Sequence, residues 1–204
     1  MNNSKKHAVV VANGEYPSHA IPLKLIEKAP FLISCDGAAD VLIEKGIIPN
    51  IIIGDGDSIS DKNKAKYQSI LHIINEQETN DLTKAISFLL SHHFTDITIV
   101  GATGKREDHT LGNISLLIEY KQKCNIKMVT DHGIFYPCIN KFEIDLNDIY
   151  PISIINFGAK NLKSSGLAYP IRDFSNWWQG TLNKNTEKKV TIDAVGPFLI
   201  YIAF

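Results

Sequence analysis

Short apolar runs alternate with helix patterns along residues 8–129, and this alternation restricts the chain to a small set of folds. The runs are rich in Ile and Val, which is typical of strands buried on both faces of a parallel sheet. Their alternation with helices predicts an α/β fold, a mostly parallel sheet with helices on both faces. The expected strands cover residues 8–12, 31–34, 51–53, 70–74, 97–100 and 126–129. The expected helices cover residues 23–28, 38–45, 61–68, 80–91 and 110–120.

The pattern changes near residue 132, where helix periods give way to short strand-like runs separated by turn formers. These runs cover residues 134–136, 142–144, 152–157, 167–171, 190–192 and 198–204. Short strands between turns are typical of a small antiparallel sandwich. We therefore predict an α/β domain over residues 1–131 and a C-terminal antiparallel β-sandwich over residues 132–204.

Composition and charge limit the partners and the compartment. A formal net charge of -1 gives no general attraction to nucleic acid or to an anionic membrane. Cys35, Cys124 and Cys138 include no Cys-x-x-Cys pair, which favours a reducing compartment over a disulfide framework. Only five consecutive apolar residues precede Asn13-Gly14, too few for a signal-peptide core or a membrane span. We expect a cytoplasmic protein.

Four aspartates lie just beyond the ends of expected strands: Asp36, Asp55, Asp57 and Asp108. The carboxyl ends of parallel strands form the ligand crevice of an open α/β sheet. Carboxylates that converge there repel one another unless a hard cation neutralises them. Mg²⁺ carrying a nucleotide phosphate is the obvious candidate.

The turn at residues 54–58 carries two of these carboxylates. Asp55 and Asp57 are two residues apart, and the glycines beside them allow the backbone to approach closely, so both could converge on one cation. The alternative is an ordinary turn, since Gly, Asp and Ser are common turn formers. A second acidic segment downstream, residues 76–81, favours the metal site.

This second segment follows the expected strand 70–74 and would face the same crevice. Its Asp81 could bind metal, or it could complement the dipole of a helix capped by Asn80 or Thr79. Lys84, one turn into that helix, could then reach a phosphate.

The glycine-containing loop at residues 101–109 also follows a strand and precedes a helix. Its backbone N–H groups, with Lys105 and Arg106, could bind phosphate oxygens. The alternative is an ion pair between Arg106 and Asp108. Further along, Trp177 and Trp178 could pack within the sandwich or offer a stacking surface to a flat, cationic ring.

Taken in order, these segments resemble the thiamine pyrophosphokinase family. The matching segments are residues 35–39, 46–50, 54–58, 77–84, 101–109 and 165–169. The resemblance implies an α/β domain followed by a β-sandwich, in a homodimer that binds thiamine where the subunits meet. It also implies transfer of a diphosphate group from ATP to the hydroxyethyl group of thiamine, with release of AMP.

The resemblance and the charge of the reactants together suggest a role for each candidate. Metal ligands are Asp55, Asp57 and Asp81, and the proton acceptor is Asp36 or Asp108. Groups that bind the nucleotide and its phosphates are Gln77, Lys84, Thr103, Lys105, Arg106 and His109. Thiamine contacts are expected from Ser165, Leu167, Trp177 and Asn185 in the sandwich.

The chain departs from the family pattern at a few of these positions. Gly56 stands where the family commonly has Phe, and Asn80 where it has Thr. Glu76 and Glu78 replace aspartates, which bears on metal geometry because Glu is one methylene longer. The C-terminal Ser-Asn pair of the family is matched here only by Lys184-Asn185.

Two other classes of function remain open. A haloacid-dehalogenase-like phosphatase would use Asp55 as nucleophile and Asp57 as acid, although no later Asp-Asp motif follows a strand. A non-catalytic nucleotide sensor is the other. Within the kinase interpretation, the acceptor could be a related heteroaromatic alcohol such as a pterin.

Overall fold

The computed structural model describes residues 6–204, which divide into two compact units. Residues 1–5, the start of the amino-terminal segment from which a cytoplasmic location was expected, lie outside the described residues. The second unit takes residues 117–122 as well as residues 132–204, and the first unit takes the rest. The sequence-based division after residue 131 had placed residues 117–122 in the first domain.

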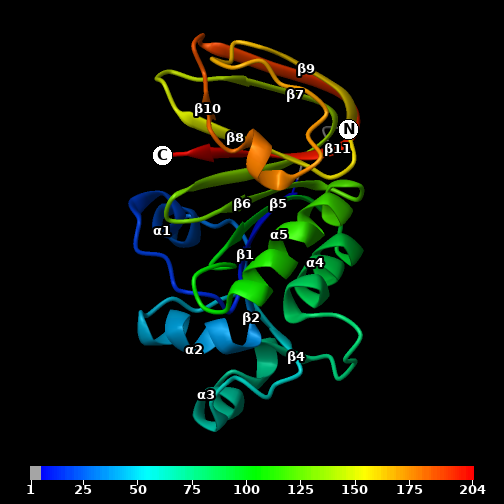
Figure 1. The fold of residues 1–204 in the computed structure, drawn as a ribbon. Coiled ribbons are helices and arrows are strands. Elements are labelled where there is room, and N and C mark those ends of the chain that lie inside the picture. The colour runs from blue at the N-terminus through cyan, green and yellow to red at the C-terminus, as the bar shows by residue number, and fades with distance from the viewer. Residues whose placement is uncertain (1–5) are drawn as a thin grey trace, which may run out of the picture. The chain divides into compact units, whose positions relative to one another are not determined.

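The first unit contains a sheet of six parallel strands in the order β6-β5-β1-β2-β3-β4 (Figure 1). The strands are β1 Lys6–Val11, β2 Leu32–Cys35, β3 Ile51–Gly54, β4 Leu71–Ile73, β5 Phe94–Val100 and β6 Asn125–Val129. The central strands β1 and β2 are almost entirely buried, as their continuous apolar sequence predicts.

Helices cover both faces of this sheet, with α1 and α2 on one face and α4 on the other (Figure 1). Right-handed crossovers explain this, because the chain moves outward from β1 to β4 and then returns through α4 to β5. The helices are α1 Ala20–Glu27, α2 Asp36–Glu44, α3 Asp61–Lys66, α4 Asp81–Ser91 and α5 Glu107–Lys121, with a 3₁₀ turn η1 at Gln68–Ile70.

The strand order reverses at β1, whose neighbours β2 and β5 lie far apart in the sequence. The chain leaves β1 in one direction towards β2 and arrives at β5 on the opposite side of it. The crevice at such a switch point, outside the carboxyl ends of the strands, is where open α/β sheets bind ligands.

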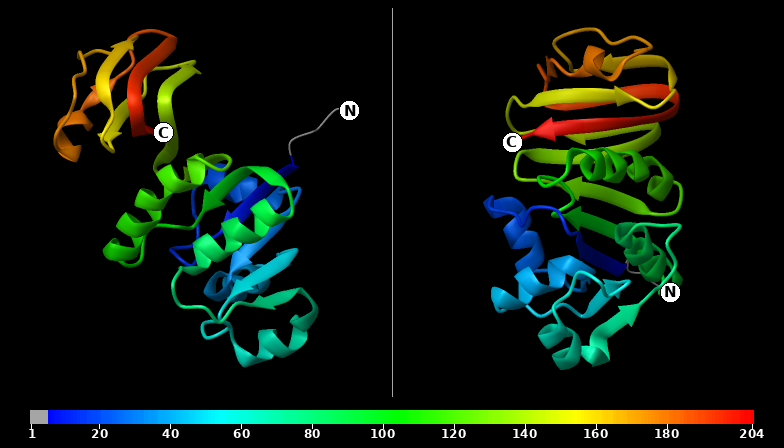
Figure 2. Two further views of the ribbon diagram at one scale, coloured as in Figure 1. Left: turned by 90° about the vertical axis from the view of Figure 1, so that its right-hand side faces the viewer. Right: turned by 60° about the horizontal axis from the view of Figure 1, so that its bottom comes forward.

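The second unit is an antiparallel arrangement, coloured from yellow-green to red in Figure 2. Its longest strand pairs with three others, and a fully buried Phe198 lies in its core. The strands are β7 Gly133–Asp145, β8 Pro151–Asn156, β9 Lys160–Ser165, β10 Asn183–Lys184 and β11 Lys189–Ala203, with a 3₁₀ helix η2 at Trp177–Gly180.

The strand predictions for this unit were partly wrong. The expected strand at 167–171 is a loop in which Leu167 makes one isolated bridge to Asn185. The chain instead forms β9 just before it, where a polar sequence with only Leu162 buried gave no strand signal.

Two pairs of expected short strands are single long ones, β7 and β11. The turn expected at Gly196-Pro197 is a bulge, where the register of β11 against β7 shifts between Asp193 and Pro197. A bulge adds residues to one strand without ending the ladder, so turn-forming residues do not mark a strand end here. The predicted fold class is confirmed. None of the helices described for residues 6–204 has the length and apolar character needed to cross a membrane.

Candidate active site

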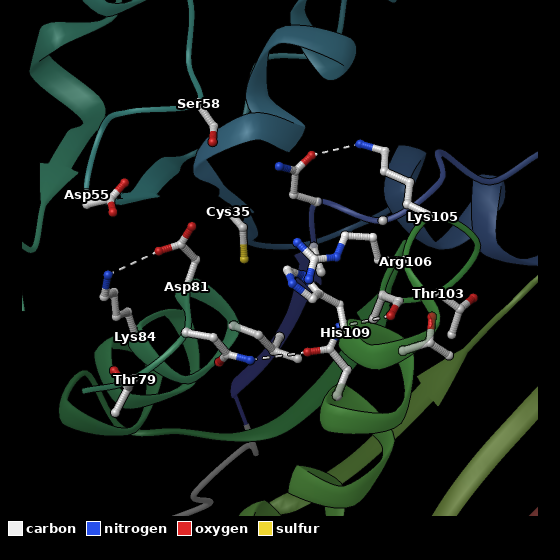
Figure 3. A pocket seen from close by; sticks show the side chains of 18 of the residues that line it. Cys35, Asp55, Ser58, Thr79, Asp81, Lys84, Thr103, Lys105, Arg106 and His109 are labelled. Carbon is white, nitrogen blue, oxygen red and sulfur yellow. Dashed lines mark hydrogen bonds and ion pairs between the residues drawn. The ribbon is translucent and has the colours of Figure 1, made fainter. Parts of the chain in front are cut away.

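A cleft with a volume of about 430 Å³ opens at the carboxyl ends of the parallel strands in the first unit (Figure 3). Its walls come from the segments that follow β1, β2, β3, β4 and β5, so it surrounds the switch point. The lining includes these sequence-predicted residues: Asp55, Gln77, Asp81, Lys84, Thr103, Lys105, Arg106 and His109.

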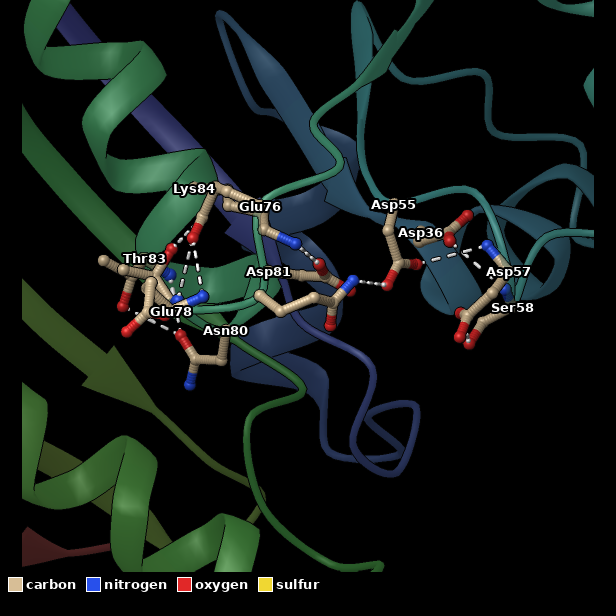
Figure 4. A network of polar contacts seen from close by, with 12 residues as sticks. Asp36, Asp55, Asp57, Ser58, Glu76, Glu78, Asn80, Asp81, Thr83 and Lys84 are labelled. Carbon is tan, nitrogen blue, oxygen red and sulfur yellow. Dashed lines mark hydrogen bonds and ion pairs between the residues drawn. The ribbon is translucent and has the colours of Figure 1, made fainter.

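Three aspartates gather beside this cleft and form what we call the acidic cluster: Asp36, Asp55 and Asp57 (Figure 4). Each offers a carboxylate oxygen, and these oxygens all lie within 4.8 Å of one another. The sequence-based metal set contains Asp81 in place of Asp36. The geometry therefore adds Asp36 to the residues that could share a cation.

The first residue of α2, Asp36, is fully buried because β3 ends directly against it. A Cβ atom on Gly54 would lie 2.5 Å from the Asp36 Cβ, so only glycine permits this approach. The backbone N–H of Ser58 donates to Asp36 Oδ2 at 3.2 Å. The other oxygen, Oδ1, is buried without a hydrogen-bond partner among the described residues.

The other two members of the acidic cluster are held by the turn itself. Asp55 Oδ1 accepts from the Asp57 N–H at 3.2 Å, and Asp55 Oδ2 accepts from Gln77 Nε2 at 3.3 Å. These hydrogen bonds lower the pKa of Asp55. Gly56 between them has φ +81°, a left-handed conformation that a side chain such as Phe adopts only with strain.

Burial raises the pKa of Asp36, and the neighbouring charges of Asp55 and Asp57 raise it further. The hydrogen bond from Ser58 acts in the opposite direction and lowers it. A buried, incompletely bonded carboxylate beside two others is costly without a positive charge. All the donors are hard oxygens, which Mg²⁺ prefers. The residues present therefore fit a magnesium ion.

A buried lysine, Lys84, supplies positive charge near Asp55, and its charge helps to lower the pKa of that carboxylate. Lys84 Nζ lies 3.2 Å from Asp81 Oδ1, and only 3% of the lysine side chain is exposed. Burial raises the pKa of Asp81, and the hydrogen bond from Lys84 opposes that shift. Asn80 caps α4, with its Oδ1 accepting from the Thr83 N–H at 2.9 Å, so one of the two capping residues considered is confirmed.

The glycine-containing loop before α5 places two cations at the cleft (Figure 3). Lys105 Nζ donates to Asn13 Oδ1 at 3.0 Å, and Arg106 forms an ion pair with Asp108 at 2.6 Å. The hydrogen bond from Arg106 lowers the pKa of Asp108 to about 2. The ion pair considered from the sequence is thus present, and both cations still line the cleft.

Backbone contacts join the loops that follow β1 and β5. The Gly14 N–H donates to the Gly101 carbonyl at 2.6 Å, and the Glu15 N–H donates to the Thr103 carbonyl at 2.8 Å. A Cβ on Gly14 would lie 2.4 Å from that Gly101 oxygen, so the contact requires glycine. The cationic loop is therefore fixed against the end of the central strand.

The predicted thiamine contacts all belong to the second unit. Asn185 is buried, and its side chain bonds to three backbone groups, those of Asp148, Tyr150 and Glu187. Ser165 bonds to the Thr191 hydroxyl. The amide of Asn185 thus holds loops together, and its role as a substrate contact stays a prediction.

The other two lie in the loop between β9 and β10. Leu167 makes the isolated bridge to Asn185, and the Trp177 ring centroid lies 5.2 Å from that of Phe157. Trp178 is 72% exposed. Trp177 therefore contacts a neighbouring ring although 43% of it is exposed, and Trp178 faces outward. Whether either ring stacks on a cationic substrate stays a prediction.

Sequence reasoning gave no site role to three asparagines that line the cleft: Asn13, Asn80 and Asn113. Asn13 lies two residues after the end of β1, at the switch point, and Asn113 lies four residues after His109 on the same face of α5. Position at the switch point and helical spacing from a predicted site residue were the signals that could have found them.

Comparisons with known proteins decide the family. The family model described as thiamin pyrophosphokinase, catalytic domain, matches residues 23–129, and that of its substrate-binding domain matches residues 133–201. The chain is 31% identical over 176 residues to the thiamine pyrophosphokinase of Bacillus subtilis, covering 80% of this chain and 81% of the relative.

The chain belongs to the thiamine pyrophosphokinase family. Two solved structures share its fold. The Bacillus subtilis thiamine pyrophosphokinase superposes with a TM-score of 0.80 at 24% identity, covering 97% of this chain and 98% of that one. The yeast enzyme superposes with a TM-score of 0.81 at 16% identity, covering 99% and 87%. The family assignment does not support the phosphatase and sensor alternatives.

Proposed function

We propose that the chain transfers the diphosphate group of ATP to the hydroxyl group of thiamine, giving thiamine diphosphate and AMP. The observation that carries this proposal is one cleft that is lined by the cations Lys84, Lys105 and Arg106 and by Asp55, through which it adjoins the acidic cluster. Carboxylates for a metal and cations for phosphate oxygens are what a diphosphate transfer needs, because its catalysis depends on positioning and charge neutralisation.

The acidic cluster would hold Mg²⁺. Asp81 lies near enough to Asp55 and Asp36 for their charges to raise its pKa, so it could assist them. The ion would supply positive charge to the phosphate oxygens of ATP. Lys105 and Arg106 stand on a loop whose backbone is bonded to Gly14 and Glu15, so the loop itself is in place before phosphate binds. Gln77, Thr103 and His109 would complete the nucleotide contacts.

A strong general base is not required by this arrangement. Asp108 has a pKa of about 2 beside Arg106 and is a weak acceptor near neutral pH. Asp36 is committed to the acidic cluster. Phosphoryl transfer through a loose transition state removes the proton of the attacking alcohol late, so orientation of the hydroxyl matters more than its deprotonation.

The second unit would bind the thiazolium and pyrimidine rings of thiamine. A fixed positive ring is best held by aromatic faces and hydrogen-bond acceptors, and Trp177 and Trp178 offer such faces. We further propose a homodimer in the cytoplasm, with a thiamine site shared between two copies. Light scattering at micromolar concentration should then give twice the chain mass, and a fully active monomer would contradict the shared site.

The deciding experiment incubates the protein with ATP, Mg²⁺ and thiamine and separates the products by chromatography. Formation of AMP and thiamine diphosphate in equal amounts is expected. ADP as the only nucleotide product, or AMP formed only with a pterin alcohol in place of thiamine, would overturn the proposed reaction or its acceptor. A covalent aspartyl phosphate trapped on Asp55 would point to the phosphatase.

A further inference from the structure

Two asparagine side chains form a bridge across the cleft of the first unit, between the start of α4 and the middle of α5. Asn80 Nδ2 donates to Asn113 Oδ1 at 3.3 Å. Asn113 Nδ2 in turn donates to the Ala102 carbonyl at 2.9 Å, in the loop that follows β5. We call these two residues the amide bridge.

The amide bridge is continuous with the cap of α4. Asn80 Oδ1 accepts from the Thr83 N–H at 2.9 Å and from the Thr83 hydroxyl at 2.8 Å, while its Nδ2 faces Asn113. One asparagine therefore uses its oxygen to fix the first turn of α4 and its nitrogen to contact α5. A threonine at this position would keep a capping oxygen but would have no amide donor.

The two ends of the amide bridge carry different parts of the proposed phosphate site. The first turn of α4 holds Asp81 and the buried Lys84, whose backbone N–H also bonds to the Asn80 carbonyl at 3.0 Å. Ala102 immediately precedes Thr103 in the loop that carries Lys105. The amide bridge therefore links the helix that carries the buried Lys84 to the loop that carries Lys105 and Arg106.

We propose that Asn80 and Asn113 are positioning residues, which set the distance between Lys84 on α4 and the cationic loop after β5. This inference rests on the proposed diphosphate transfer. Cations that must contact the same polyphosphate need a fixed separation, since a displacement of about 1 Å at such a site lowers the rate strongly. The amide bridge provides that separation through side chains that need not touch the substrate.

The test is a double-mutant cycle with Asn80→Thr and Asn113→Leu. Asn80→Thr keeps the helix cap and removes the donor, whereas Asn113→Leu removes both hydrogen bonds at similar volume. Each variant should lower kcat roughly two- to tenfold, the effect of one lost hydrogen bond, with the thiamine KM unchanged. The double variant should be no slower than the slower single variant, because each change breaks the same hydrogen-bonded link between α4 and α5.

A second measurement does not depend on activity. Amide hydrogen exchange in the first turn of α4 should be faster in Asn113→Leu, although the substitution lies on another helix. The matched control is Asn125→Leu, which removes an amide bonded to Asp96 at 2.7 Å at the amino-terminal edge of the same sheet. That variant should leave kcat and the exchange of α4 unchanged.

If the loss of kcat in the double variant equals the product of the losses in the two single variants, the two residues act independently. That result would overturn the bridge and indicate separate substrate contacts. Unchanged kcat in Asn80→Thr would also overturn it. If Asn113→Leu does not fold, Asn113→Ser with the same Asn80→Thr partner completes the cycle. If the unmodified chain makes no AMP, the proposed function fails, while the exchange measurement still decides whether the bridge exists.

Discussion

The two units of this chain use buried positions in opposite ways. The first unit buries charge at the starts of two helices that cover its sheet, with Asp36 and Lys84 almost fully enclosed next to the cleft. The second unit has an apolar core around Phe198 and Ile200, and its one buried polar side chain among the described residues, Asn185, bonds to backbone. Stability and chemistry are therefore separated, and substitutions in the two units should have different consequences.

The largest expected effect is on turnover. Asp55→Ala or Asp57→Ala should lower kcat at least about 100-fold, because each carboxylate helps to place charge that stabilises the transition state. The unfolding midpoint should change little, since these turn residues pack against no core. Steady-state AMP formation at saturating Mg²⁺ measures the first quantity, and urea unfolding measures the second. Near-normal turnover in both variants would contradict the metal assignment.

The converse is expected in the second unit. Phe198→Ala should lower the free energy of unfolding by about 3–5 kcal/mol, because it leaves a cavity in a closed apolar core. Both tryptophans of the chain lie in this unit, so their fluorescence during urea unfolding reports on it directly. The control is Leu182→Ala, at a side chain that is 87% exposed, which should change stability by less than about 0.5 kcal/mol. Equal effects of the two changes would argue against the closed core.

A smaller effect separates the substrates between the units. Replacing Trp177 and Trp178 together by Ala should raise the thiamine KM roughly tenfold, through loss of aromatic contact with the cationic ring. The ATP KM should stay constant, because the proposed nucleotide site lies in the first unit. Initial rates with each substrate varied in turn distinguish the cases. An equal rise in both constants would indicate structural damage, and no rise in either would place the acceptor elsewhere.

The smallest effect concerns the buried carboxylate. Because the pKa of Asp36 is raised in the folded chain, its contribution to stability is greatest below the unfolded pKa and is lost as pH rises through the folded pKa. Asp36→Asn should therefore raise Tm at pH 7.5 in EDTA by roughly 2–4 °C, the shift that about 1 kcal/mol produces in a chain of this size. The gain should disappear near pH 4. A gain that is independent of pH would show that charge is not its cause.

The same contrast explains what the sequence could predict. In the first unit, buried strands such as β1 and β2 must be continuously apolar, and helices such as α4 must be amphipathic, so local patterns reveal them. In the second unit, the bulge at Gly196-Pro197 resembles a turn locally, and only pairing with β7 shows that the strand continues.

The candidate site shows a similar limit. Residues in motifs, such as Asp55 and Lys105, could be placed at the strand ends from the sequence alone. The gathering of Asp36 into the acidic cluster depends on the close approach of Gly54, and the amide bridge depends on two helices distant in sequence. Contacts of this kind are fixed by tertiary packing, which no local pattern contains.

The strand order also governs how the chain can fold while it is being made. Strand β1 emerges from the ribosome before the other strands of its sheet, yet one of its two neighbours, β5, spans residues 94–100. Synthesis proceeds at about 5–20 residues per second, so one side of β1 stays open for several seconds. A chain interrupted before residue 94 would contain four of the six parallel strands, with β1, whose last four residues are buried in the complete fold, as an unprotected edge. Incomplete chains of this protein should therefore aggregate, whereas chains that reach the end of β5 can close the sheet around β1.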